Sequence, residues 1–258
     1  MTAPGIMWRK VPRDIKRRID LCLDTALEKS MGPVTLFFRA DDAGIPGKRF
    51  QRLVTLFAKH RMPLNLAVVP AWLTGPRWRA ISGSGIKAGG LLCWHMHGWR
   101  HINHESKGKK QEFGPSRSGE EVHRDLQKGK TRLIRIMGNE FCPVFTPPWN
   151  RCGVETLHLL PQAGFKAVSR SRGSRPPAGR ELLEITVNVD LHTLKERTPA
   201  LAWRRLFSDL SHAVSGGWCG IMIHHRIMED AAFDFLDALL MALSKRDKVS
   251  PVNFRDLI

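Results

Sequence analysis

The chain has 258 residues, of which 42% are hydrophobic and 25% charged. These proportions are those of a globular protein and exclude a wholly disordered or fibrous one. The 41 lysines and arginines outnumber the 24 aspartates and glutamates, which gives a net charge of +17. Such an excess favours polyanionic partners: nucleic acid, an anionic membrane surface or phosphorylated sugars.

Three features of the sequence concern its compartment. Every apolar run is shorter than the roughly 20 residues of a transmembrane helix, and the basic N-terminal stretch is not followed by the apolar core of a secretory signal. The five cysteines are scattered, with no C-x-x-C pair, so we expect reduced and mostly buried thiols. We therefore expect the protein in the cytoplasm or at the inner face of the membrane.

Short apolar runs alternate with segments that have apolar residues at helical spacing. In chain order we expect helix Arg13–Lys29, strand Val34–Phe38, helix Lys48–His60, strands Leu64–Val69 and Leu91–Trp94, helix Ser118–Met137, strands Pro143–Phe145, Lys166–Ser169, Ile185–Val189 and Gly220–Ile223, and helix Glu229–Ser244. Two polar, basic stretches, 104–119 and 169–179, are predicted as loops. The alternation predicts an α/β fold: an irregular (β/α) barrel of about seven parallel strands, with residues 1–258 as a single domain.

Polar residues follow several of the predicted strands, at the edge where a barrel enzyme carries its active site. They are Asp41 and Asp42, His95, His97 and His101, the stretch 146–151, Asp190, and His224 and His225. Four or five such strand ends in one chain are difficult to explain as coincidence.

Asp41 and Asp42 are adjacent carboxylates, which repel each other unless a cation lies beside them. A divalent metal would supply that charge, with one aspartate as its ligand and the other free to act as a base. The alternative is an ordinary turn, because Asp-Asp-Ala-Gly after a strand is common loop chemistry.

His97 and His101 are four residues apart. If this stretch is helical, both rings lie on one face and can share a metal. Two histidines and one carboxylate form a catalytic zinc set with a position left for water. His95 and His104 add to a crowding that favours a metal cluster over single structural hydrogen bonds, and His95 could instead orient a ligand.

The last predicted strand ends in His224 and His225, which point to opposite sides if the strand continues. One of them could act as a general acid that protonates a leaving amine. Trp149 follows Pro147 and Pro148, which stiffen its backbone. It could stack on the apolar face of a sugar, or it could be a core residue.

These residues resemble the polysaccharide deacetylases, the NodB-homology group also called carbohydrate esterase family 4. The family's Thr-Phe-Asp-Asp-Gly motif corresponds to residues 39–44, with one residue inserted before the glycine, and its His-Ser/Thr-x-x-His motif corresponds to residues 97–101. Its Arg-x-Pro-aromatic motif corresponds to residues 146–149, and its last motif to the apolar run that ends at His224.

The resemblance implies a metal-dependent hydrolase that removes N-acetyl or related acyl groups from an amino-sugar-containing carbohydrate or glycoconjugate. It makes Asp41 the base, His224 the acid, and Asp42, His97 and His101 the ligands of one divalent metal. Zn²⁺ is expected before Co²⁺, Mn²⁺ or Ni²⁺. Substrate contacts are expected from Pro148, Trp149 and His225. The basic surface would suit an anionic or lipid-phosphate-linked substrate, with no specific nucleic acid expected.

The sequence departs from the family pattern at several points. Thr146 stands where the family has an arginine that helps to set the base, and Gly98 stands in the Ser/Thr position. Asp190 corresponds to the family's fourth motif, but without that arginine its role is open. The alignment at the last strand can slip by one residue, which leaves His225 as a second candidate for the acid.

A different class of function also fits the composition. Eight tryptophans and many basic residues in loops are typical of proteins that bind nucleic acid or acidic glycans without catalysis. Against this, no nucleic-acid recognition motif is present, and the histidines and carboxylates would have no role. The alternative prediction is therefore a non-enzymatic polyanion-binding protein on a deacetylase-like scaffold.

Overall fold

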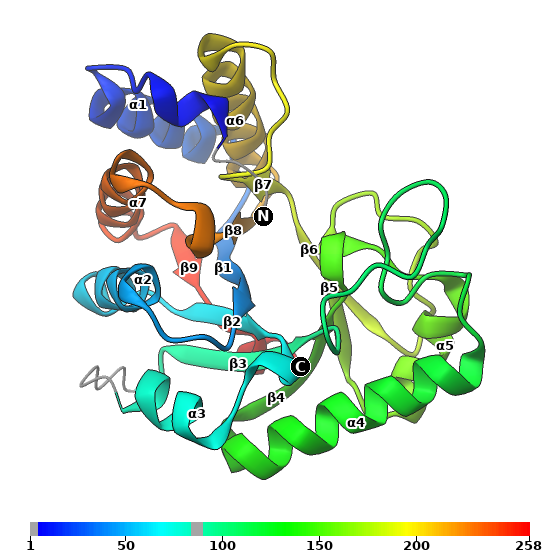
Figure 1. Ribbon diagram of the computed structural model, residues 1–258. Helices are drawn as coiled ribbons and strands as arrows, with labels where there is room; N and C mark the ends of the chain where they lie inside the picture. The colour runs from blue at the N-terminus through cyan, green and yellow to red at the C-terminus, as the bar shows by residue number, and fades with distance from the viewer. Residues whose placement is uncertain (1–4, 84–89) are drawn as a thin grey trace.

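Parallel strands close almost completely into a barrel in the computed structural model of the chain, which describes residues 5–83 and 90–258 (Figure 1). The strand order is β6-β5-β4-β3-β2-β1-β8-β7, so the barrel stays open between β6 and β7. A ninth strand pairs with the first residues of β1. The strands are β1 (Val34–Ala43), β2 (Leu64–Val68), β3 (Leu92–His97), β4 (Phe141–Thr146), β5 (Ala167–Ser171), β6 (Leu183–Val187), β7 (Val189–Asp190), β8 (Trp218–Ile223) and β9 (Val249–Pro251).

Helices surround this barrel on its outer side, as Figure 1 shows. They are α1 (Ile15–Lys29), α2 (Lys48–Lys59), α3 (Gly75–Ser82), α4 (Gly119–Met137), α5 (Val154–Gln162), α6 (Pro199–Ser215) and α7 (Asp230–Leu243). Helix α4 begins at a capping box, in which Ser118 and Glu121 satisfy each other's backbone N–H groups.

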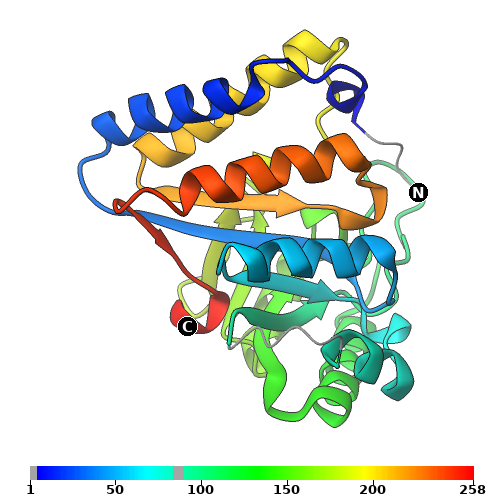
Figure 2. The same cartoon turned by 90° about the vertical axis from the view of Figure 1, so that its left-hand side faces the viewer.

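Alternation along the strands divides the side chains between two environments. On β1, Phe38 belongs to the large core between sheet and helices, whereas Phe37 belongs to a smaller cluster inside the barrel. Phe254, in the C-terminal turn, packs against Phe37 with ring centroids 5.4 Å apart. Figure 2 shows that this turn lies at the end of the barrel away from the strand arrowheads. The barrel interior is thus apolar at this end. The polar residues of β1 lie toward the opposite end, where the strands finish, which we call the mouth of the barrel.

The predicted barrel is confirmed, and each predicted strand and helix overlaps an observed element, although several predicted ends lie one or two residues outside it. The run Ile185–Val189 is an exception, because it forms two strands at opposite ends of the sheet order. Asn188 separates them: its side chain bonds the Trp218 carbonyl and the Gly220 N–H of β8, and this draws the following residues to β8. Helices α3, α5 and α6 and the short strand β9 were not predicted.

The five cysteines are free thiols, and all but Cys22 are buried, as expected. Among the described residues, no helix is long and apolar enough to cross a bilayer.

Candidate active site

The aspartate pair lies at the end of β1, where the strand pairing is irregular between Ala40 and Ala43. Asp42 adopts a left-handed conformation with φ of 63°, which aspartate tolerates better than most residues. The bulge separates the two carboxylates: Asp41 is buried on the barrel's inner side, whereas Asp42 is partly exposed at its mouth.

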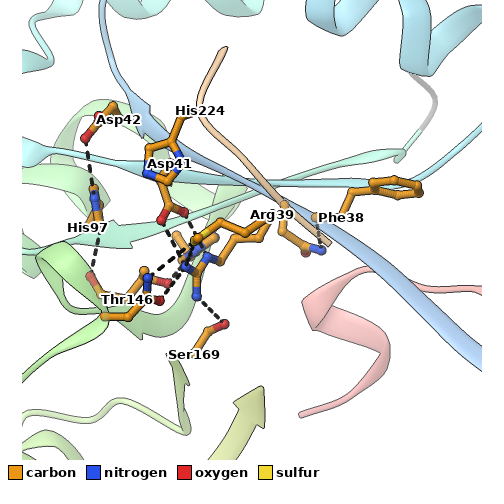
Figure 3. A network of polar contacts seen from close by, with 12 residues as sticks. Phe38, Arg39, Asp41, Asp42, His97, Thr146, Ser169 and His224 are labelled. Atoms are coloured by element: carbon orange, nitrogen blue, oxygen red, sulfur yellow. Dashed lines mark hydrogen bonds and ion pairs between the residues drawn. The ribbon is translucent and has the colours of Figure 1, made fainter. Parts of the chain in front are cut away.

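Arg39 holds the carboxylate of Asp41. Residues i and i+2 of a strand share a face, and Arg39 Nε and Nη2 donate to the two Asp41 oxygens at 2.8 and 2.9 Å (Figure 3). The remaining donors of the guanidinium reach Ser169 Oγ at 2.9 Å and Asn150 Oδ1 at 2.6 Å. Burial opposes ionisation of Asp41, but the charges of Arg39, His97 and His224 outweigh it, so the pKa of Asp41 lies below its ordinary value.

Asp42, His97 and His101 converge at the barrel mouth. Their potential ligand atoms all lie within 4.8 Å of one another. Asp42 Oδ1 is 3.5 Å from His97 Nε2 and 3.3 Å from His101 Nε2. Nitrogen and carboxylate oxygen donors in this number form a catalytic zinc set with an open position.

Two observations show that this triad fits a metal ion. His97 Nδ1 lies 3.0 Å from the carbonyl oxygen of Thr146, which only accepts hydrogen bonds. In neutral His97 the proton is therefore on Nδ1, which leaves the Nε2 lone pair for a metal. Asp42 Oδ1 is buried and makes no hydrogen bond of ordinary length among the described residues. It faces Nε2 of His97 and of His101, and a cation between the three atoms would satisfy it.

The electrostatics of the metal-free triad differ from ligand to ligand. Burial, together with the charge of His97, lowers the pKa of His101 to about 4. Burial also acts against protonation of His97, but the carboxylates of Asp42 and Asp41 outweigh it and raise its pKa. Burial of Asp42 is in turn outweighed by the histidines, which hold its pKa well below the ordinary value. Without metal, Asp42 is therefore an anion that holds a proton on His97 and leaves His101 neutral.

His97 and His101 do not share a helix, so the helical reason for pairing them is wrong, although the structure does bring them together. His97 ends β3, and the next residues form an irregular loop in which Gly98 and His101 have φ of 58° and 61°. The buried carboxylate of Glu112 holds this loop. It accepts the backbone N–H groups of Trp99, Arg100 and His101 at 3.1, 2.6 and 3.1 Å.

Trp149 and Asn150 also lie in the left-handed region, with φ of 57° and 59°. This conformation is strained for a bulky residue, and such strain clusters at functional sites. It turns the ring of Trp149 to within 4.6 Å of the His101 ring, between centroids, and aims the Asn150 amide at Arg39. Pro148 is buried beneath this turn.

The two histidines after β8 lie in different surroundings. His224 is half-buried and lies beside Asp41 and Asp42 (Figure 3). His225 is buried against Phe50, with ring centroids 5.7 Å apart, and burial lowers its pKa to about 4. His224 thus faces the site, whereas the His225 ring is buried against helix α2, so its predicted contact with substrate stays a prediction.

Among the contacts of the described residues, Asp190 has no hydrogen bond with His224 or His225. Its carboxylate accepts the backbone N–H groups of His192 and Thr193 and the Thr193 hydroxyl, and so closes its own turn. The buried His192 in that turn accepts the backbone N–H of His224 on Nδ1 at 3.4 Å. Asp190 therefore supports the acid candidate only through the loop that carries His192.

No protein-family model matches the sequence, and no curated protein matches it. Solved structures match most of it. A Mycobacterium smegmatis protein assigned to the polysaccharide deacetylases superposes with a TM-score of 0.64 at 14% identity, over 88% of this chain and 89% of that one. A family 4 carbohydrate esterase from Streptomyces lividans, in complex with acetate, gives 0.53 at 12% identity over 87% and 93%.

The fold is that of the polysaccharide deacetylases. A family 4 acetyl xylan esterase from Clostridium thermocellum, in complex with a cobalt ion, also matches, with a TM-score of 0.54 at 13% identity over 86% and 89% of the chains. So does a family 4 pseudoenzyme from Bacillus anthracis, with 0.55 at 13% identity over 85% and 63%. The fold alone therefore does not distinguish an active from an inactive protein.

Both departures from the deacetylase motifs have a local explanation. Thr146 leaves no arginine on β4, and Arg39 of β1 contacts Asp41 instead. Gly98 leaves no hydroxyl in the histidine loop, and a Cβ there would lie 2.0 Å from Glu112 Oε2 and 2.6 Å from Pro148. The glycine thus makes room for the carboxylate that holds the loop.

His95, below these residues, is not brought to the metal triad. Its Nε2 shares a hydrogen bond of 2.9 Å with the Thr146 hydroxyl, and its ring packs on Phe254. Burial and the charge of Arg39 hold its pKa well below the ordinary value. His95 is therefore a neutral residue that supports Thr146, whose carbonyl in turn orients His97.

Sequence reasoning missed Arg39 and Glu112. Arg39 had a signal, because an arginine two residues before a candidate base on a buried strand shares its face and needs a carboxylate partner. Glu112 had none, because it lies in a loop and acts on backbone groups ten or more positions away.

Proposed function

We propose that the protein is a metal-dependent hydrolase that removes N-acetyl groups from an amino-sugar-containing carbohydrate. The observation that carries the proposal is the convergence of Asp42, His97 and His101 beside a separate carboxylate, Asp41, that an arginine holds. This arrangement supplies a metal site and a base from adjacent residues of one strand.

Asp42, His97 and His101 would hold the metal, with Zn²⁺ as the first candidate. When bound, the metal polarises the acyl carbonyl and lowers the pKa of a water molecule. The Thr146 carbonyl keeps His97 in the tautomer that binds metal, and Glu112 keeps the loop of His101 in place.

Asp41 is the base in this proposal. Its lowered pKa keeps it ionised at neutral pH, so it can take the proton of the attacking water. The bidentate contact with Arg39 fixes the direction of the carboxylate, at the expense of some basicity.

His224 is the proposed acid, because it is partly exposed beside the aspartates, whereas the neighbouring His225 is buried. It would protonate the departing amine as the C–N bond breaks. Trp149, held against His101 by its strained turn, offers an aromatic face to the sugar, with Pro148 supporting the turn.

Acetate release from N-acetylglucosamine oligomers tests the proposal, with zinc-loaded wild type beside Asp41→Asn. We expect release by the wild type and none above background by the variant, with equal metal content in both proteins. Release at the wild-type rate by Asp41→Asn would refute the assignment of the base.

The net charge of +17, and the pseudoenzyme among the similar structures, favour a second candidate function: polyanion binding without catalysis. Binding of a fluorescent oligonucleotide or of heparin that needs no metal, together with no acetate release from any N-acetylated sugar, would establish this function instead.

A further inference from the structure

The loops that follow β3, β4 and β8, each of which carries residues of the proposed site, hold more cations than acids. Their cations are Arg100, Lys107, Lys109, Lys110, Arg117, Arg151 and Arg226, and their acids are Glu105, Glu112 and Glu229. Glu112 is buried and bonds backbone N–H groups, and Arg117 is paired with Asp125. These three loops, here called the rim of the site, therefore carry a net positive charge.

Arg226 is the member of this rim with the most defined position. It lies two residues after His224, and its guanidinium carbon lies 4.9 Å from the centroid of the Trp72 ring. The Trp72 ring lies 5.8 Å from that of His101. The guanidinium is thus two ring contacts away from a proposed metal ligand.

The surroundings hold Arg226 in place without neutralising it. Its backbone carbonyl accepts a hydrogen bond of 2.9 Å from Arg49 Nη1, and stacking on Trp72 fixes its plane. The Trp72 turn is itself held by Arg132, whose side chain donates to the carbonyls of Pro70 and Leu73 at 2.9 and 2.6 Å. Among the described residues, no carboxylate forms an ion pair with Arg226, whereas Arg39 and Arg170 each have one.

We propose that the substrate of this site carries a carboxylate or phosphate group next to the N-acyl sugar, and that Arg226, stacked on Trp72, binds that group. The inference rests on the proposed deacetylase function and specifies its substrate class. A stacked guanidinium keeps a planar edge of N–H donors that matches either anion in a bidentate contact. A neutral sugar chain would leave this cation without a counter-charge beside a divalent metal.

The test compares N-acetylglucosamine oligomers with two anionic probes: an N-acetylmuramic acid-containing disaccharide for the carboxylate and N-acetylglucosamine 6-phosphate for the phosphate. We expect kcat/KM to be about tenfold or more higher for one anionic probe, mainly through KM, as for a hydrogen bond to a charged group. Which probe is preferred identifies the anion.

Arg226→Gln should bring the ratio of anionic to neutral kcat/KM to about one. The matched control is Arg135→Gln in the exposed last turn of α4. It removes the same charge from the protein and should keep the wild-type ratio. Equal kcat/KM for neutral and anionic sugars in the wild type, or an unchanged ratio in Arg226→Gln, would overturn the proposal.

A binding measurement separates this inference from the proposed function. Calorimetric titration of the anionic probes into Asp41→Asn and into Asp41→Asn/Arg226→Gln needs no turnover. If the metal-loaded wild type deacetylates none of the sugars while binding still depends on Arg226, the hydrolase is refuted and the anion site is kept. Deacetylation with no dependence of binding on Arg226 would refute the anion site alone.

Discussion

Replacing Arg39 with methionine tests the link between the buried ion pair and catalysis. The change removes hydrogen bonds of 2.8 and 2.9 Å to Asp41 and leaves a carboxylate that is 2% exposed without that cation. Removing one partner of a buried ion pair costs about 3–5 kcal/mol. If Asp41 instead takes up a proton at pH 7, the cost is about 4 kcal/mol, because its ordinary pKa is about 3.9 and each unit corresponds to about 1.36 kcal/mol. The second response also removes the base.

Denaturant unfolding and acetate release measure the two consequences separately. We expect Arg39→Met to lose about 4 kcal/mol of unfolding free energy and about a hundredfold in kcat, as for a misplaced catalytic group. The matched control is Arg170→Met. Arg170, on β5, is also fully buried, and it forms an ion pair of 2.6 Å with Glu184 on β6. Its loss should lower stability and leave kcat unchanged.

An exchange of positions completes the test. Arg39 and Thr146 both lie close to His95, so we expect a guanidinium placed on β4 to reach Asp41. The double variant Arg39→Thr/Thr146→Arg should recover part of the kcat that Arg39→Thr loses. Wild-type kcat in metal-loaded Arg39→Met, or an equal loss of kcat in Arg170→Met, would refute the reasoning.

Three further predictions concern the metal triad. The wild type should hold about one metal ion per chain by elemental mass spectrometry, as for a site of this donor set. Asp42→Asn and His101→Ala should lose this ion, whereas Asp41→Asn should retain it. Metal retained in both ligand variants would exclude this triad. Glu112→Ala leaves three backbone N–H groups without their acceptor and should weaken zinc binding about 10–100-fold in a chelator competition. Gly98→Ser should also weaken zinc binding, because its Cβ meets Glu112. Unchanged zinc affinity in both variants would contradict a role for the carboxylate. The raised pKa of His97 stabilises the metal-free fold fully below its ordinary value near 6.5, and this stabilisation disappears as the pH rises through the raised value. Zinc binding at pH 6.5 should therefore release more than about half a proton per ion, from His97 and not from His101, in calorimetry with two buffers of different ionisation enthalpy. No buffer dependence would refute this.

The parts of the fold that the sequence predicts are those with a strong local pattern. The buried strands read as continuous apolar runs, and α1, α2, α4 and α7 each carry an apolar stripe. Helix α6 was missed although it begins with Thr198 as a side-chain cap and a proline in its first turn. Strand β9 has only three residues, too few for any period, and pairing with β1 is what makes it a strand.

The metal triad was predictable because its members are chemically conspicuous and lie at strand ends. Its supporting residues were not, because their roles depend on contacts across the barrel. Ser169 lies 130 positions from Arg39, and Asn150 lies 111 positions away, yet both accept from its guanidinium. A serine and an asparagine in such positions have no pattern that separates them from ordinary surface residues. The helical spacing of His97 and His101 led to the right pair for a wrong reason, since strained loop geometry and Glu112 bring them together.

The two departures from the family motifs bear on whether this scaffold is catalytic or decayed. A buried ion pair such as Arg39–Asp41 is weak support for stability, because apolar residues of similar volume often serve as well or better. The same holds for a carboxylate such as Glu112, whose burial raises its pKa despite three backbone donors. Both arrangements therefore reduce stability, which a protein without catalysis would not require. Both also act on groups that the proposed reaction uses: Asp41, the base, and the loop that carries His101, a metal ligand. In a decayed site we would expect the missing arginine and hydroxyl to leave their partners unsupported. Here Arg39 of β1 contacts Asp41, and Glu112 holds the loop of His101. This support from other segments favours a working hydrolase over a binding protein.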